Sequence, residues 1–265
     1  MLAPLVHRAR KRFGQHFLQD DWVIEQMLQA LNPQSQDALV EIGPGLGALT
    51  EPLIQRAKRL TVIELDRSLA NHWQQRASRE SLLTVIQQDA LRVDFADLAE
   101  QQGVRLRVLG NLPYNISTPL LLKLLEQSVA IQDMLLMLQA EVAQRLTASP
   151  GSKAYGRLTV LTHYYCDVEL LFLVPAEAFR PAPKVTSAVV RLIPHQQPTY
   201  PVADLGCLQK ICAAAFSQRR KTLRNSLQAL FTGEQLKALA IDPTERAESI
   251  TLEQYCRLAN SLKKF

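Results

Sequence analysis

The amino-acid sequence predicts an α/β protein: a doubly wound, mainly parallel sheet with antiparallel edge strands, followed by a small all-α domain. Between residues 22 and 138, short β-rich runs alternate with segments of helical periodicity, the pattern of a parallel sheet covered by helices. Between residues 158 and 193, strand-like runs follow one another with little helix between them, which indicates an antiparallel addition at the sheet edge. After residue 205 the periodicity is helical.

Each element rests on its own local pattern. The first helix, residues 22–31, has apolar side chains at helical spacing and stops at Asn32-Pro33. The expected parallel strands are the β-rich runs 38–42, 60–65, 83–87, 104–109 and 134–138, and the helices between them are 49–58, 69–79 and 118–127. The expected edge strands are 158–165, 168–174 and 187–193, and the C-terminal helices are 205–216, 222–231, 234–239 and 252–262.

Three prolines, at positions 194, 198 and 201, surround a polar stretch that has the composition of a linker. We therefore expect a larger domain over residues 1–195, including a basic N-terminal arm, and a smaller helical domain over residues 202–265. A chain of 265 residues with 47% apolar residues is long enough for both cores.

Composition narrows the functional class. No run approaches the roughly 18 apolar residues that span a membrane, and the N-terminal segment lacks the features of a signal peptide, so we expect a cytoplasmic protein without membrane contact. The four cysteines form no CxxC pair and no histidine cluster lies near them. We therefore expect reduced, structural thiols and no bound metal.

The net charge of +5 is concentrated in two basic clusters, which points to a polyanionic partner. Residues 200–265 hold ten Lys and Arg against six Asp and Glu. The alternative is that both clusters are merely solvated surface. We expect RNA binding by Arg10, Lys11, Arg12, Arg219, Arg220, Lys221 and Arg224. Within the second cluster, Arg220 and Arg224 stand four residues apart and would share one face of a helix.

The sequence Asn111-Leu112-Pro113-Tyr114 predicts a site that modifies an exocyclic amine. Conjugation with the ring makes such an amine poorly nucleophilic, and the Asn111 amide oxygen and the Leu112 carbonyl could accept its two hydrogens. Pro113 fixes the backbone, and Tyr114 offers a face on which an extruded base stacks. The alternative is a simple turn after a strand, where Asn and Pro are common.

Polar residues follow four predicted strands, and ligands of open parallel sheets bind at these carboxyl ends. Gly43 begins a GxGxG turn that allows a ligand to approach the backbone. Glu64 follows the second strand at the distance expected for a carboxylate that binds ribose hydroxyls, Asp89 is placed for an adenine amino group, and Asn111 ends the fourth strand. This arrangement predicts S-adenosyl-L-methionine. A nicotinamide cofactor is the weaker alternative, because its GxGxxG spacing is absent.

Seven motifs spread over nearly the whole chain resemble the ribosomal RNA adenine dimethyltransferases of the KsgA (RsmA) type. They are Arg12-Phe-Gly-Gln-His-Phe-Leu18, Val40-Glu-Ile-Gly-Pro-Gly45, Val62-Ile-Glu-Leu-Asp66, Gln88-Asp-Ala90, Gly110-Asn-Leu-Pro-Tyr-Asn115, Phe179-Arg-Pro-Ala-Pro-Lys-Val185 and Arg219-Arg-Lys-Thr-Leu-Arg-Asn225. The resemblance implies a Rossmann-like S-adenosylmethionine-dependent methyltransferase fold. It also implies N6,N6-dimethylation of two adjacent adenosines in the 3′-terminal hairpin loop of 16S ribosomal RNA, within a 30S precursor particle.

The same resemblance implies roles for individual residues. The cofactor site would comprise His16, Leu18, Gly43, Glu64, Asp89 and Asn111. The catalytic group would comprise Asn111, Leu112 and Tyr114, with Phe179 packing on the other face of the target adenine. His16 is a departure, because many relatives carry Asn there; both side chains can form hydrogen bonds.

Two further alternatives stay open at this point. A resistance-type relative would dimethylate large-subunit RNA, and the helical-domain motif favours the small-subunit enzyme over it. A non-catalytic assembly factor could keep the fold and lose the chemistry, which the intact loop at 111–114 argues against. Nothing in the sequence indicates a self-association surface, so we expect a monomer.

Overall fold

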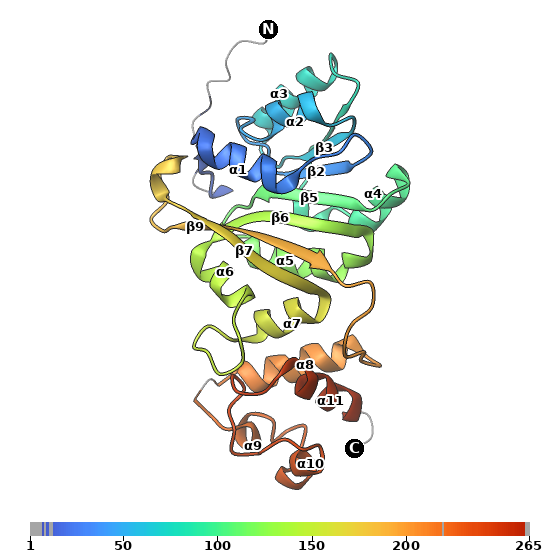
Figure 1. Ribbon diagram of the computed structural model, residues 1–265, viewed down its shortest axis with the longest axis vertical. Coiled ribbons are helices and arrows are strands. Elements are labelled where there is room, and N and C mark those ends of the chain that lie inside the picture. The colour runs from blue at the N-terminus through green and yellow to red at the C-terminus, as the bar shows by residue number, and fades with distance from the viewer. Residues whose placement is uncertain (1–6, 8, 11–12, 219, 263–265) are drawn as a thin grey trace. The chain divides into compact units, whose positions relative to one another are not determined.

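The computed structural model describes residues 7, 9–10, 13–218 and 220–262, and the chain forms two compact units (Figure 1). The sheet unit comprises Met1–Ala143 and Glu169–Pro194, and the helical unit comprises Gln144–Val168 and His195–Phe265. Each unit has its own core of buried side chains.

A seven-stranded sheet in the order β4-β3-β2-β5-β6-β9-β7 forms the centre of the sheet unit. Its strands are β2 (Ala38–Ile42), β3 (Leu60–Ile63), β4 (Leu83–Ile86), β5 (Leu106–Asn111), β6 (Ile131–Gln139), β7 (Cys166–Val174) and β9 (Ser187–Pro194). Pairing is parallel from β4 through β6, whereas β9 is antiparallel to β6. The predicted doubly wound sheet with an antiparallel edge is confirmed.

The strand order places the ligand-binding region of the sheet. From β2 the chain adds β3 and β4 on one side, and then returns to add β5 and β6 on the other. The order therefore reverses between β2 and β5, and the carboxyl ends of these two strands flank the crevice where open α/β sheets bind ligands.

Most helices of the sheet unit follow the predicted pattern. They are α1 (Asp21–Leu31), α2 (Thr50–Arg56), α3 (Arg67–Ala77), α4 (Phe95–Gln102) and α5 (Ser117–Glu126), with α6 (Ala140–Leu146) spanning the unit boundary and short 3₁₀ turns η2 (Ala90–Arg92), η3 (Ser128–Ala130) and η4 (Ala176–Ala178). In α1, the Asp20 carboxylate accepts from the first-turn amides, and Asn32 closes the helix in the left-handed conformation. The sequence analysis did not identify α4 or α6.

A second sheet of two short strands lies beside the first. Phe17–Leu18 (β1) pairs antiparallel with Phe179–Arg180 (β8). This pairing joins the N-terminal segment to the segment before β9, two parts of the chain that are far apart in sequence. It ties residues 17–18 of the N-terminal segment to the sheet unit.

In the helical unit, one segment expected as a strand is a helix. Residues 158–165, expected as a strand, form helix α7 (Arg157–Tyr165). Their β-branched and aromatic side chains favour strands locally, but the Gly156 amide donates to Thr159 Oγ1 at the helix start, and α7 packs against α8 and α11. Tertiary packing overrides the local propensity here.

The remaining helices of this unit are α8 (Leu205–Phe216), α9 (Leu223–Ser226), α10 (Gly233–Ala238) and α11 (Leu252–Ser261). Helix α9 is much shorter than the expected 222–231, and Arg220 lies before it, so the expectation that Arg220 and Arg224 share a helical face is wrong. Because α7 packs with the C-terminal helices, residues 144–168 group with the helical unit. The domain limits 1–195 and 202–265 stay a prediction.

Candidate functional site

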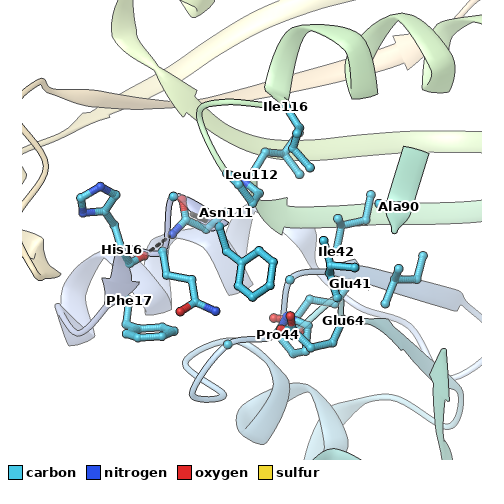
Figure 2. Close-up of a pocket in the computed structure, with 18 of the residues that line it drawn as sticks. His16, Phe17, Glu41, Ile42, Pro44, Glu64, Ala90, Asn111, Leu112 and Ile116 are labelled. Atoms are coloured by element: carbon cyan, nitrogen blue, oxygen red, sulfur yellow. Dashed lines mark hydrogen bonds between the residues drawn. The ribbon is translucent and has the colours of Figure 1, made fainter. Parts of the chain in front are cut away.

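A cavity of about 300 Å³ lies at the carboxyl ends of the parallel strands in the sheet unit. Figure 2 shows its walls converging from the ends of β2, β3 and β5 and from the segment before β1. The volume falls at the lower end of the roughly 300–1,000 Å³ typical of small-molecule sites. The cavity thus occupies the place that the strand order predicts for a ligand.

The glycine-rich turn after β2 is shaped by its neighbours. Gly43, Gly45 and Gly47 all have positive φ, at 72°, 54° and 97°, a region that side chains disfavour. A Cβ on Gly47 would come within 2.7 Å of the buried Trp73 ring, and the Trp73 indole N–H donates to the Gly45 carbonyl at 3.1 Å. The turn therefore lies directly on Trp73, with its backbone available to the cavity.

Glu64 stands at the end of β3 with only 6% of its surface exposed. Burial raises the pKa of this carboxyl to about 6, while hydrogen bonds from the backbone amides of Asp66, Gly45 and Leu65 oppose the shift. Its Oε1 accepts from the Asp66 amide at 2.8 Å. These bonds hold the carboxylate in position, and it could accept hydrogen bonds from the two hydroxyls of a ribose.

Asp89 lies after β4 and also lines the cavity. Its Oδ1 accepts from the Leu91 amide at 3.0 Å, which caps the following 3₁₀ turn. The capping bond orients the carboxylate, and a carboxylate has further acceptor sites for a ligand. Asp89 therefore lies where it could accept a hydrogen bond from the amino group of a ligand.

Glu41 is a cavity residue that the sequence analysis missed. It is 2% exposed, lines the cavity from β2 and accepts a hydrogen bond from Thr50 Oγ1 at 2.7 Å. Burial raises its pKa to about 7, with the nearby Glu64 charge adding to the shift. The sequence did contain a sign of this residue: it is the one acidic residue in the otherwise apolar strand Ala38-Leu-Val-Glu-Ile42. Burying a carboxylate costs free energy, so an acidic residue in such a strand indicates a functional role.

The loop after β5 is anchored on both sides. The Leu112 amide donates to the Met137 carbonyl of β6 at 3.1 Å, and the Asn111 side-chain amide donates to the His16 carbonyl at 2.9 Å, as Figure 2 shows. Before them, a Cβ on Gly110 would lie 2.5 Å from the Ile42 carbonyl oxygen. Close approach of β5 to β2 therefore requires glycine at position 110 and brings Asn111 to the cavity.

Tyr114 forms one aromatic wall of the site. Its ring stacks with the His16 ring at a centroid separation of 5.6 Å and an interplanar angle of 24°. Its hydroxyl shares a 2.7 Å hydrogen bond with Ser187 Oγ, and burial raises the pKa of the phenol. His16 is held in turn by the Pro181 carbonyl, 2.7 Å from its Nδ1. Both rings are half-buried and in fixed positions.

The structure brings together nearly all the predicted catalytic and cofactor residues. The cavity wall includes His16, Leu18, Gly43, Glu64, Asp89, Asn111, Leu112 and Tyr114. Phe179 is the exception: its side chain is fully buried in the core of the sheet unit and does not line the cavity. Its pairing with Leu18 in the small sheet explains this position. In this structure Phe179 is a core residue beside the cavity residue Leu18.

The N-terminal segment contributes more of the wall than the sequence indicated. Besides His16 and Leu18, the cavity is lined by Phe13, Gly14, Gln15 and Phe17. A Cβ on Gly45 would contact the Phe17 ring at 3.1 Å, so this segment packs on the glycine-rich turn. Residues 13–18 are too short and aperiodic for their sequence to reveal such a contact.

The predicted RNA-binding residues that the structure describes are not among those that line the cavity. Arg220, Lys221 and Arg224 are exposed in the helical unit. Arg10, in the sheet unit, forms an ion pair with Asp66 at 3.1 Å. Lys11, Arg12 and Arg219 fall outside the described residues.

The described part of the chain holds no group of His, Cys, Asp and Glu side chains arranged for a metal ion. In the same residues, we find no helix with the length and apolar character needed to cross a bilayer.

The four cysteines are buried and unpaired, and burial raises the pKa of Cys166, Cys212 and Cys256 to about 12, so these thiols are unreactive.

Comparison with known proteins adds to this geometry. The family model described as ribosomal RNA adenine dimethylase matches residues 6–264. A protein of Pectobacterium atrosepticum named "Ribosomal RNA small subunit methyltransferase A" is 57% identical over 258 residues, which cover 97% of this chain and 95% of the relative. A protein of the same name from Yersinia pseudotuberculosis is 58% identical over 256 residues, covering 97% and 94%.

Solved structures resemble the chain as well. A dimethyladenosine transferase from Plasmodium falciparum has a TM-score of 0.81 and 25% identity, and the match covers 94% of this chain and 98% of that one. The 23S rRNA methyltransferase ErmE has a TM-score of 0.71 and 25% identity, with 93% and 99% covered. The resemblance extends over both units.

Proposed function

The chain belongs to the ribosomal RNA adenine dimethylase family, and we propose that it dimethylates N6 of two adjacent adenosines in the 3′-terminal hairpin loop of 16S rRNA. It is an rRNA methyltransferase that uses S-adenosylmethionine. One observation carries the proposal: the acid-lined cavity and the Asn111–Tyr114 loop meet at the carboxyl ends of β2 and β5.

The cavity residues fit this cofactor. Glu64 would accept hydrogen bonds from the ribose hydroxyls, Asp89 would accept one from the adenine amino group, and the glycine-rich turn would let the cofactor contact the backbone. The buried Glu64 carboxylate suits a ligand that carries a positive sulfur. When bound, S-adenosylmethionine supplies an electrophilic methyl carbon.

Asn111 prepares the acceptor amine. Because its Nδ2 donates to the His16 carbonyl, its Oδ1 is oriented to accept a hydrogen from the adenine N6 amine. The Leu112 carbonyl accepts the second hydrogen, and both contacts push electron density onto the nitrogen. Leu112 itself is fixed by the hydrogen bond that its amide donates to the Met137 carbonyl of β6. The Asn111 oxygen and the Leu112 carbonyl are therefore held in place before the substrate arrives, as catalysis by positioning requires.

Tyr114 supplies the face on which the extruded adenine stacks. The hydrogen bond between its hydroxyl and Ser187 fixes the orientation of the ring. No buried base close to Asn111 is required, because the amine loses its proton after attack, when it is strongly acidic. The chain's main contribution to the reaction is therefore positioning.

The names of the relatives and the charge distribution support the proposed substrate particle. The names of the relatives at 57–58% identity refer to the small ribosomal subunit. Exposed Arg220, Lys221 and Arg224 are suited to bind phosphates. We propose that the protein acts as a cytoplasmic monomer on a 30S precursor, with the C-terminal domain contacting rRNA.

One experiment tests the substrate assignment. Purified protein and labelled S-adenosylmethionine are incubated with undermethylated 30S subunits and, separately, with 50S subunits, and modified nucleotides are mapped by mass spectrometry. We expect two adjacent N6,N6-dimethyladenosines in 16S rRNA and none in 23S rRNA. Modification of 23S rRNA instead would support the resistance-type alternative, and no modification in a single turnover would support a non-catalytic factor.

A further inference from the structure

Asp66 connects the N-terminal segment to helix α3. We call the described residues 7, 9, 10 and 13–18 the arm. The Asp66 carboxylate contacts the arm at Arg10 (3.1 Å), Gln15 Nε2 (3.2 Å) and His7 Nε2 (3.4 Å). It also caps α3 by accepting from the Ser68 amide at 3.0 Å and the Ser68 hydroxyl at 2.8 Å.

The arm residues around Asp66 also bind one another. Gln15 Oε1 accepts from the Arg10 amide at 2.8 Å and lies 3.4 Å from His7 Nε2. The second imidazole nitrogen of His7 is 3.2 Å from Ser68 Oγ. The result is a closed network with a single carboxylate at its centre, and the Asp66 side chain is fully buried beneath it.

Asp66 stands outside the cavity, whereas the arm forms part of its wall. Gln15, His16 and Phe17 line the cavity, and the His16 carbonyl holds the Asn111 amide. From Gln15, which touches Asp66, the chain therefore runs directly into the residues that face the ligand. Loosening the contacts at Asp66 would free this wall without removing any group that touches the ligand.

We infer that Asp66 is a positioning residue that fastens the arm over the cofactor cavity and thereby raises affinity for S-adenosylmethionine. The inference rests on the proposed cofactor site. A buried carboxylate with this many donors is stable only when they are in place. Despite its burial, hydrogen bonds from Ser68 and Gln15 and the Arg10 charge keep the pKa of Asp66 below its ordinary value.

Arg10 then has a different role from the RNA binding that the sequence predicts for it. Its guanidinium neutralises Asp66, although the side chain remains 40% exposed. Arg10 therefore contributes to cofactor binding by way of the arm, while its exposed part can still face RNA.

Asp66→Asn is the sharpest test. Asn caps helices about as well as Asp, so the bonds from Ser68 to Oδ1 are kept. The negative charge that Arg10 contacts is lost, and the new NH₂, which replaces Oδ2, opposes the Gln15 amide donor. Asp94→Asn is the matched control, because Asp94 caps α4 in the same unit through the Ala96 and Asp97 amides, away from the arm.

Calorimetry should show that Asp66→Asn raises the Kd for S-adenosylmethionine about tenfold, which corresponds to ~1.4 kcal/mol, while Asp94→Asn leaves it unchanged. Amide exchange in residues 13–18 should accelerate only in the Asp66 variant. With saturating cofactor, kcat should recover, because no group at the reacting atoms is missing. Arg10→Ala should raise the Kd about threefold. The double variant should raise the Kd by less than the product of the two single effects, because Arg10 acts through Asp66.

The inference fails if Asp66→Asn binds the cofactor within twofold of the wild type, or if Asp94→Asn loses affinity to the same extent. Should Asp66→Asn not fold, Arg10→Ala carries the test alone, and an unchanged Kd in that variant would refute the fastening role. Absence of binding by the wild-type protein would instead count against the proposed cofactor site.

Discussion

The side-chain amide of Asn111 donates a hydrogen bond to the backbone carbonyl of His16 across 2.9 Å. This bond links the end of β5 to a segment almost one hundred residues earlier in the chain. It also orients the Asn111 side chain: the nitrogen is directed at His16, and we expect the oxygen to be the atom that accepts from a substrate amine.

Replacing Asn111 by Ala should therefore reduce kcat on the order of 100-fold, since a misplaced acceptor costs about that much, and leave the Kd for S-adenosylmethionine within a few-fold of wild type. Single-turnover methylation of 30S subunits gives the rate, and calorimetry gives the affinity. Wild-type turnover in this variant would exclude Asn111 from the reaction.

Gly110 should be intolerant of any side chain. A Cβ there would lie 2.5 Å from the Ile42 carbonyl oxygen, and neither backbone can move away without separating β5 from β2. Gly110→Ala should lower the free energy of unfolding by about 3 kcal/mol, at the upper end for overpacking. Gly103→Ala is the control: its Cβ meets nothing within 4 Å, so it should lose ~1 kcal/mol from its positive φ alone. Denaturant unfolding compares the two.

Cofactor affinity should depend on pH through Glu64. The pKa of this carboxyl is raised to about 6, and in the proposed cofactor site its ionised form would accept hydrogen bonds from both ribose hydroxyls. Affinity should fall as the pH drops below about 6, because binding must then expel a proton. Calorimetry between about pH 5 and about pH 8 measures this. In Glu64→Ala, affinity should be weaker throughout; an unchanged Kd would remove Glu64 from the site.

Glu41 should make the protein less stable at high pH. Burial raises its pKa in the folded state to about 7 from an ordinary value of 4.5, so the folded state binds more protons than the unfolded state between these values. Stability must therefore decrease as the pH rises through this window. Glu41→Gln should raise Tm relative to wild type at about pH 8 and change it little near pH 5. An equal shift at both pH values would contradict this assignment.

The basic cluster of the helical unit should contribute to particle binding. Reversing Arg220 and Arg224 to Glu should weaken binding to 30S precursors at least tenfold and reduce its salt dependence, because fewer phosphate counterions are released. Affinity for S-adenosylmethionine should stay unchanged. Equal binding of both proteins to the particle would show that the cluster only solvates the surface.

The residues at the strand ends were predictable because parallel strands place their carboxyl ends at one edge. This rule alone located Gly43, Glu64, Asp89 and Asn111. Contacts between distant segments were not accessible in this way. The burial of Phe179 depends on its pairing with β1, and the helix at 157–165 depends on packing that outweighs its strand-like composition.

Trp73 lies beneath the glycine-rich turn and donates to the Gly45 carbonyl, while the other of the chain's two tryptophans, Trp22, is 60% exposed. The molecule thus contains its own optical probe. In a Trp22→Phe background, all indole emission comes from a ring in direct contact with the ligand-facing backbone. Titration with cofactor can then be followed by fluorescence, without any label.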